Sequence, residues 1–300
     1  MGHDHAHSTN HRGKLATVLA MSLLVFVLQL VVGLMTGSLA LLSDAVHVLS
    51  DSAGLMMALV ASMIAQVPSS NRRTFGLHRS EVLAAGANGL MLLGMCIGIV
   101  ISAVGRLADP PRIDAPLVLG AGIVGLAVNV IGLLLLRSGA AENLNVKGAY
   151  MEVLGDALGS VAVLVSAIAI LVGRWYILDP IASLVIAALI LPRAMSLLRE
   201  VGEVLLQASP RGMDIDELRS HITGVDGVVD IHDLHVWTLT SQLPVMSAHV
   251  VVGPDVTTMS HAHEILDRLD ECLSTHFDIR HSTFQFEPVE HQESEAKTHR

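Results

Sequence analysis

The stretch Leu42-Ser-Asp-Ala-Val-His-Val-Leu-Ser-Asp51 places ionisable groups inside a run that is otherwise apolar enough to cross a membrane. His47 and Asp51 stand four residues apart. On an α-helix this spacing puts both side chains on one face, one turn apart, where their donor atoms can converge on one cation. Because a charge at bilayer depth is costly, such residues usually mark a path for ions or protons.

A second stretch, Glu152-Val-Leu-Gly-Asp156, aligns with His47-Val-Leu-Ser-Asp51 without a gap. Two helices that each offer two ligands can complete the four-coordination of a metal ion. A contact with a neighbouring helix explains a single intramembrane His or Asp well, but it explains two matched pairs poorly. The sequence therefore predicts a divalent metal site built from His47, Asp51, Glu152 and Asp156.

The composition is that of a polytopic membrane protein. Of the 300 residues, 52% are hydrophobic and only 15% are charged, and the mean hydropathy is +0.59, which is too apolar for a soluble protein of this size. The net charge of -10 comes largely from residues beyond 200, and nucleic acid is not an expected partner. Cys96 and Cys272 form no CxxC pair, which argues against a disulfide framework or a thiolate zinc site.

Apolar runs of spanning length predict six transmembrane helices in the bilayer. Basic residues gather on one side of the resulting topology, so the positive-inside rule places both termini in the cytosol. The second and fifth helices then run in opposite directions, and the two ligand pairs lie on antiparallel helices, as in a 3+3 inverted repeat. The runs are 15–36, 39–66, 80–105, 115–136, 149–173 and 177–198.

Residues 15–200 thus form the predicted transport domain, and the character changes to a C-terminal cytosolic α+β domain over residues 201–288. Its periodicity predicts the order α-β-β-α-β, with two helices on one face of a three-stranded sheet, as in ferredoxin-like or metallochaperone-like folds. The predicted elements are a helix at 214–223, strands at 228–240 and 244–252, a helix at 260–277 and a last strand at 279–288.

Both ends of the chain are polar, and we expect both to be disordered. Residues 289–300 are rich in Glu. Residues 1–14 are rich in His, a composition that suits weak metal capture as well as it suits an added tag or an inert tail. The histidines of this tail are His3, His5, His7 and His11.

Motifs along nearly the whole chain resemble the cation diffusion facilitator family, in its zinc, cadmium and cobalt branch. They are LLSDAVHVLSD (41–51), TFGLHRSEVLAA (74–85), NVKGAYMEVLGDALGS (145–160), DPIASLVIA (179–187), HDLHVW (232–237) and SAHV (247–250).

This resemblance implies a homodimeric, proton-coupled antiporter in a bacterial cytoplasmic membrane. Its substrate would be a divalent metal exported from the cytosol, with zinc as the first choice ahead of cadmium and cobalt. The resemblance further implies that Zn²⁺ is a regulatory ligand of the cytosolic domain. It implies neither an enzymatic activity nor an organic cofactor, and the only other partner it implies is the lipid bilayer.

Glu152 departs from the family pattern, because this branch has His at that position. With a divalent ion the formal charge of the site becomes about -1 instead of zero. Three carboxylates in a low dielectric cannot all ionise when no metal is bound, so we expect one to keep a proton near neutral pH. This predicts tight coupling to the proton gradient and weaker discrimination against Mn²⁺, which keeps a Mn-type or broad-specificity exporter open as an alternative.

Several other residues are weaker metal or proton candidates. Asp44 lies one turn outward of His47 and is either an exit relay or a packing residue at the start of the helix. His78 falls by resemblance at an access or interface position, although a surface His at a helix start needs no function. In the cytosolic domain the resemblance puts His232, His249 and His263 on ligand positions and Glu287 in place of an acidic ligand. Gln285 stands where some relatives have His, and His281 on the same strand face is expected to substitute for it.

Two other function classes compete with transport. An intramembrane enzyme could use paired His and Asp to activate water, but no nucleophile motif accompanies them. A membrane metal sensor would use the cytosolic histidines and leave the four membrane ligands without a purpose. ATP hydrolysis is disfavoured because no GxxxxGK[ST] motif occurs.

Overall fold

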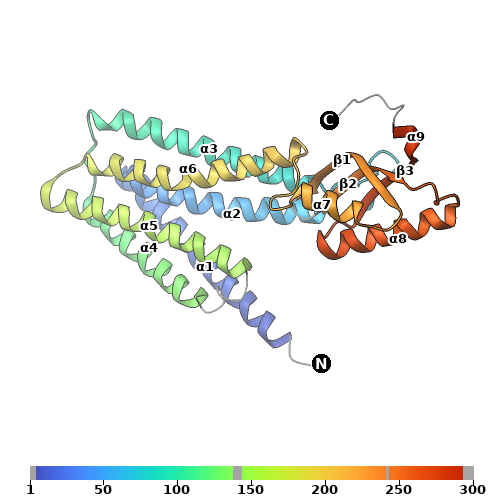
Figure 1. Cartoon of the computed structure of the whole chain (residues 1–300). Coiled ribbons are helices and arrows are strands. Elements are labelled where there is room, and N and C mark those ends of the chain that lie inside the picture. The colour runs from blue at the N-terminus through green and yellow to red at the C-terminus, as the bar shows by residue number, and fades with distance from the viewer. Residues whose placement is uncertain (1–4, 138–143, 241–242, 293–300) are drawn as a thin grey trace. The chain divides into compact units, whose positions relative to one another are not determined.

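The structure, a computed structural model, describes residues 5–137, 144–240 and 243–292. It divides into two units, Met1–Val60 with Ala84–Leu198 and Ala61–Leu83 with Arg199–Arg300, whose elements Figure 1 labels. The long helices are α1 (His5–Thr36), α2 (Leu39–Ala65), α3 (Ser80–Leu107), α4 (Ala115–Leu136), α5 (Leu144–Gly173) and α6 (Leu178–Leu205). The later elements are α7 (Ile215–Thr223), β1 (Val228–Thr240), β2 (Leu243–Val252), α8 (Met259–His276), β3 (His281–Pro288) and α9 (Val289–Gln292).

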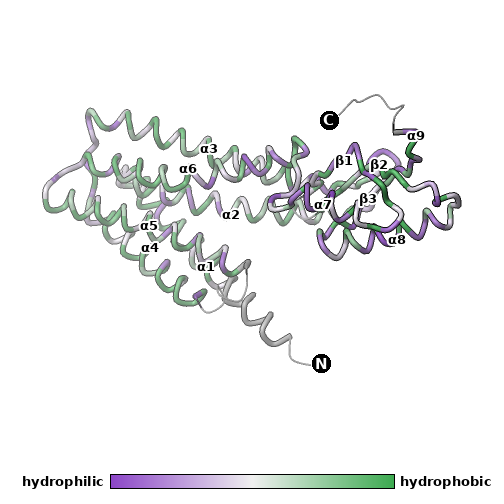
Figure 2. Tube along the Cα trace, viewed as in Figure 1, coloured by the Kyte–Doolittle hydropathy of each residue, from purple (hydrophilic) through white to green (hydrophobic). Residues whose placement is uncertain are grey.

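Helices α1 to α6 contain six segments that are long and apolar enough to cross a membrane, as predicted. Figure 2 colours the trace by hydropathy and shows hydrophobic residues in green along these helices. Large Leu, Ile, Val and Met side chains remain exposed on them, whereas Ala40, Ala167 and Ala194 are fully buried between helices. This pattern suits a lipid environment, where small residues let helices approach closely.

Both chain ends differ from the expected disorder. Helix α1 already begins at His5, so residues 5–14 of the polar tail are helical. Once a helix has nucleated, each further residue adds a hydrogen bond, so the transmembrane helix can continue into a polar segment. Residues 289–292 form the short helix α9. The remaining parts of the predicted tails, 1–4 with His3 and 293–300, lie outside the described residues.

A buried carboxylate joins the starts of α2 and α6. Asp179 accepts hydrogen bonds from Ser38 Oγ (2.6 Å) and from the backbone N–H groups of Leu39 (2.7 Å) and Ala40 (3.3 Å). Helix N-termini leave such N–H groups without partners inside the helix. Asp179 on α6 therefore caps the N-terminus of α2 from another helix, although 140 residues separate it from Leu39.

The C-terminal domain has the predicted α-β-β-α-β order and a three-stranded sheet in the order β1-β2-β3. β1 pairs antiparallel with β2, and β2 pairs parallel with β3. Leu218 and Ile222 of α7 and Leu269 of α8 pack with Met246 and Val250 of β2 in one buried core. Because strand side chains alternate, the residues between these core positions point to the opposite face of the sheet.

Candidate metal sites

Three of the four predicted membrane ligands lie together. His47 Nε2 is 3.5 Å from Asp156 Oδ1 and 3.9 Å from an oxygen of Asp51, and one donor atom of each residue lies within 4.8 Å of the others. Tetrahedral zinc with bonds of about 2.0 Å has donors about 3.3 Å apart. The described residues give the buried Asp156 Oδ1 no hydrogen-bond partner. One imidazole and two carboxylates at these distances fit a divalent transition metal.

The two helices approach each other in opposite directions, as an inverted repeat requires. His47 on α2 lies against Asp156 on α5. Asp51 lies one turn after His47 on α2, and Glu152 lies one turn before Asp156 on α5. A shared partner bridges Asp51 and Glu152. The i, i+4 spacing in both helices thus produces two levels of side chains at the site.

The shared partner is Arg193 of α6, which the sequence reasoning did not assign to the site. Its Nη1 lies 3.0 and 3.2 Å from the two oxygens of Asp51, and its Nη2 forms an ion pair with Glu152 Oε1. Arg193 and Glu152, together with His47, line a cavity of about 140 Å³. Arg193 brings a positive charge that the expectation of three uncompensated carboxylates had left out.

Asp44 sits in a separate buried polar network, three residues before His47. Its Oδ2 accepts a hydrogen bond from Gln29 Nε2 (2.6 Å) and one from Ser160 Oγ (3.3 Å). Asn129 donates to Ser160 (3.3 Å) and so extends the network to α4. A Cβ added at Gly159 would lie 2.6 Å from Asp44 Oδ1, so the close approach of α5 to Asp44 needs glycine there. The exit-relay role of Asp44 stays a prediction.

A second cluster lies on the sheet face opposite α7 and α8. His232 and His249 are direct cross-strand partners, and both approach the buried Glu287 of β3, at 3.3 Å and 2.9 Å. The three side chains offer donor atoms within 4.8 Å of one another. Two imidazoles and a carboxylate are a fitting donor set for zinc.

The structure does not bring the other predicted ligands of this domain to the cluster. His263 is 70% exposed on α8 and lies 3.9 Å from Asp267. His281 is exposed at the start of β3, with its ring against that of Phe75. It therefore does not substitute for Gln285, since four residues along a strand span about 13 Å. His78 is exposed and belongs to neither cluster.

Two neighbours of the second cluster, Gln285 and Asp233, make contacts that the sequence did not predict. Gln285 donates a hydrogen bond of 2.5 Å to Glu287 and so orients this carboxylate. Asp233 has a positive φ of 50° at an irregularity in β1, which brings its carboxylate within 3.8 Å of His249. At Cys272, burial raises the pKa of the thiol, which disfavours the thiolate that a metal would need.

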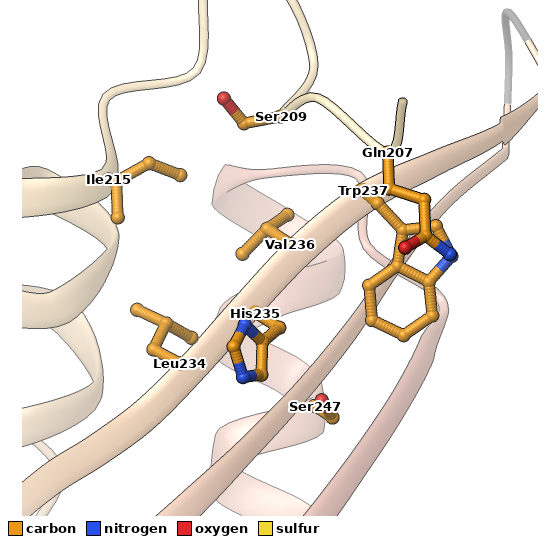
Figure 3. Close-up of a pocket in the computed structure, with 8 residues that line it drawn as sticks. All are labelled: Gln207, Ser209, Ile215, Leu234, His235, Val236, Trp237 and Ser247. Atoms are coloured by element: carbon orange, nitrogen blue, oxygen red, sulfur yellow. The ribbon is translucent and has the colours of Figure 1, made fainter. Parts of the chain in front are cut away.

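A larger cavity of about 530 Å³ lies beside β1, and Figure 3 shows the residues that line it. Its lining includes His235 and Trp237 of β1 and also Gln207, which follows α6. Among the described residues, its lining holds one histidine and no carboxylate. It therefore does not gather three histidine or carboxylate donors, and it is distinct from the cluster of His232, His249 and Glu287.

Comparisons with known proteins identify the family of both parts of the chain. The model of the Cation efflux transmembrane domain matches residues 15–206, and that of the Cation efflux protein, cytoplasmic domain, matches residues 210–289. A solved structure, the metal-bound C-terminal domain of the CzcD transporter from Cupriavidus metallidurans, is 39% identical with a TM-score of 0.23, and the match covers 25% of this chain and 99% of that one.

Full-length relatives have similar identities. The metal cation efflux system protein CzcD of Cupriavidus metallidurans is 39% identical over 99% of this chain and 93% of its own length. The cadmium, cobalt and zinc/H(+)-K(+) antiporter of Bacillus subtilis is 36% identical over 99% and 95%. The zinc transporter ZitB of Escherichia coli is 35% identical over 96% and 93%. The chain therefore belongs to the cation diffusion facilitator family of cation efflux proteins, in its zinc, cadmium and cobalt branch.

Proposed function

We propose that this protein is an antiporter that exports divalent transition metal from the cytosol in exchange for protons, with zinc as the main substrate and cadmium and cobalt as others. The observation that carries this proposal is the group formed by His47, Asp51 and Asp156 on two antiparallel membrane helices. The relatives named for zinc, cadmium and cobalt transport support the same substrates. As a member of a cation efflux family the chain is a transporter and not an enzyme.

The chemistry of the donor groups explains how metal is exchanged for protons. A metal ion binds carboxylates and neutral imidazole only after they have lost their protons, so metal binding releases protons and protonation favours metal release. In an inverted-repeat transporter the site stays near the midplane while the helices around it open to one side and then to the other. A site that is loaded from the cytosol and protonated from outside would therefore drive export.

We also propose the topology, the membrane and the assembly state of the transporter. The excess of basic residues on one side supports cytosolic termini, and relatives from bacteria support a bacterial cytoplasmic membrane. The cytoplasmic domain matched by the family model supports assembly as a homodimer in the lipid bilayer. A Mn-type or broad-specificity exporter has less support, because Glu152 is paired with Arg193.

Metal flux into proteoliposomes tests the proposed function. We expect an imposed pH gradient to drive Zn²⁺ movement, and we expect a protonophore to abolish this movement. The same assay in buffers without K⁺ separates protons from potassium as the counter-ion, a question raised by the name of the Bacillus subtilis relative, a zinc/H(+)-K(+) antiporter. Zinc flux that does not respond to the pH gradient would contradict proton coupling.

For the C-terminal domain we propose that His232, His249 and Glu287 bind a regulatory Zn²⁺ ion. His249→Ala is expected to weaken zinc binding at this cluster by at least about tenfold, the effect of 1.4 kcal/mol, because the ion loses one of three ligands. Isothermal titration of the full chain with zinc measures the loss. His263→Ala is the matched control, since His263 is exposed on α8 away from the cluster. An equal loss in both variants would contradict this ligand set.

A further inference from the structure

Arg193 places a permanent positive charge at the transport site, and two acidic residues hold it there. Its guanidinium contacts both oxygens of Asp51 through Nη1 and pairs with Glu152 through Nη2. Arginine keeps its charge at any physiological pH and forms such forked contacts readily. Glu152 is not in the group of donors that lie within 4.8 Å of one another, whereas Asp51 is.

We propose that Glu152 binds Arg193 and not the transported metal, and that Arg193 is a tethered cation which competes with the metal for Asp51. This inference rests on the proposed transport function. Glu152 is the fixed end of the tether, and Asp51 is the end that changes partner. The ligands of the metal are then His47, Asp51 and Asp156, with a fourth position left for water, as in open zinc sites.

The charges support this assignment. The three carboxylates carry -3, Arg193 carries +1 and a divalent ion carries +2, and these charges sum to zero. The same neutrality would be reached by a site with two carboxylates and no arginine. Without Arg193, the metal-loaded site would carry an uncompensated negative charge in a low dielectric, which is costly. Glu152 and Arg193 therefore form a neutral pair that adds nothing to the net charge of the loaded site.

The contact between Arg193 and Asp51 also affects how the metal binds. While Nη1 lies 3.0 and 3.2 Å from the two oxygens of Asp51, its positive charge and its hydrogen bonds compete with a metal ion for this carboxylate. A metal that binds Asp51 weakens the contact with the guanidinium, and Glu152 keeps the guanidinium nearby. Arg193 is thus a positioning residue that acts on the metal through Asp51.

A double-mutant cycle tests the proposal with Glu152→Gln, Arg193→Gln and the double variant. Each is made in the full chain with His249→Ala, so that the C-terminal cluster contributes little binding. Glu152→Gln leaves Arg193 with Asp51 as its remaining anionic partner, so Zn²⁺ affinity is expected to fall at least about tenfold. Arg193→Gln removes the cation that competes for Asp51, so affinity is expected to rise by a similar factor. In the double variant no guanidinium is left for Glu152 to hold, so its affinity is expected to stay within about threefold of that of Arg193→Gln.

The absorption spectrum of bound Co²⁺ gives a second readout, because it reports the ligands directly. We expect Glu152→Gln to leave this spectrum unchanged and Asp51→Asn to change it. Arg193→Lys, which keeps the charge, is expected to retain both the spectrum and the fold, as checked by size-exclusion chromatography. A changed spectrum in Glu152→Gln, or an equal loss of affinity from Glu152→Gln with and without Arg193, would overturn the proposal.

The failure of this inference can be told apart from the failure of the proposed function. Zinc affinity that does not depend on Asp51, together with absent proton-driven flux, would reject both. Intact flux in the wild type combined with additive effects of the two substitutions would reject the tethered cation alone.

Discussion

Asp51→Ala is expected to reduce proton-driven zinc flux at least about 100-fold, because it removes one of three ligands from a site in which no other described donor lies as close. The loss also leaves Arg193 paired with Glu152 alone, so a positive charge stays beside the remaining ligands. Flux is measured in proteoliposomes by a zinc-sensitive dye enclosed in the vesicles, with an imposed pH gradient. Asp51→Asn keeps the size of the side chain and is expected to lose flux to the same degree.

Asp109→Ala is the matched control for this prediction. Asp109 is an exposed acidic residue of the loop between α3 and α4, and its replacement is expected to leave flux within about twofold of the wild type. If Asp51→Ala kept half of the wild-type flux, the metal would have to be carried by other residues. Because Asp51 lies among other carboxylates, its removal is expected to change the melting temperature by only a few degrees. A lost activity with a retained fold is the signature of a ligand.

The helices and the two ligand pairs could be predicted because they depend on local patterns. Runs of apolar residues determine which segments can span a membrane, and the i, i+4 spacing places two ligands on one helix face. Arg193 was missed although it falls inside the sixth predicted run. The positive-inside rule uses it only as one of the basic residues that set the topology, and its partners Asp51 and Glu152 lie 142 and 41 residues away in the sequence. A charge within a spanning run is the signal that could have identified it.

In the C-terminal domain the alternation of apolar residues predicted the strands. Which histidines and carboxylates come together depends on how neighbouring strands are paired, which the alternation does not determine. His281 is an even number of residues from Gln285, so the two side chains share one face of the strand. This spacing does not bring them close together, and the register pairs His249 with Gln285. The irregularity in β1 that turns Asp233 toward His249 has no marker in the sequence. Asp179 lay in a motif identified by resemblance, but only the structure shows that it caps another helix.

Asp179→Ala is expected to lower the free energy of unfolding of the transmembrane unit by several kcal/mol. Asp179 and Ser38 are almost fully buried, and the substitution removes the acceptor of three hydrogen bonds, from Ser38 Oγ, Leu39 N and Ala40 N. Each buried donor left without an acceptor costs about 1–3 kcal/mol, and little water is present in the hydrocarbon region to replace the carboxylate. Unfolding by denaturant or by heat in detergent measures the change.

Asp114→Ala provides the comparison, because Asp114 is the N-cap residue of α4 and its side chain makes no capping hydrogen bond. It is expected to change stability by less than about 0.5 kcal/mol. Asp179→Asn keeps one acceptor oxygen and should lie between the two. Equal stability of the Asp179→Ala and Asp114→Ala variants would mean that the N–H groups of α2 find acceptors elsewhere. If the three variants fall in the expected order of stability, a side chain of α6 fixes the start of α2, the helix that carries His47 and Asp51.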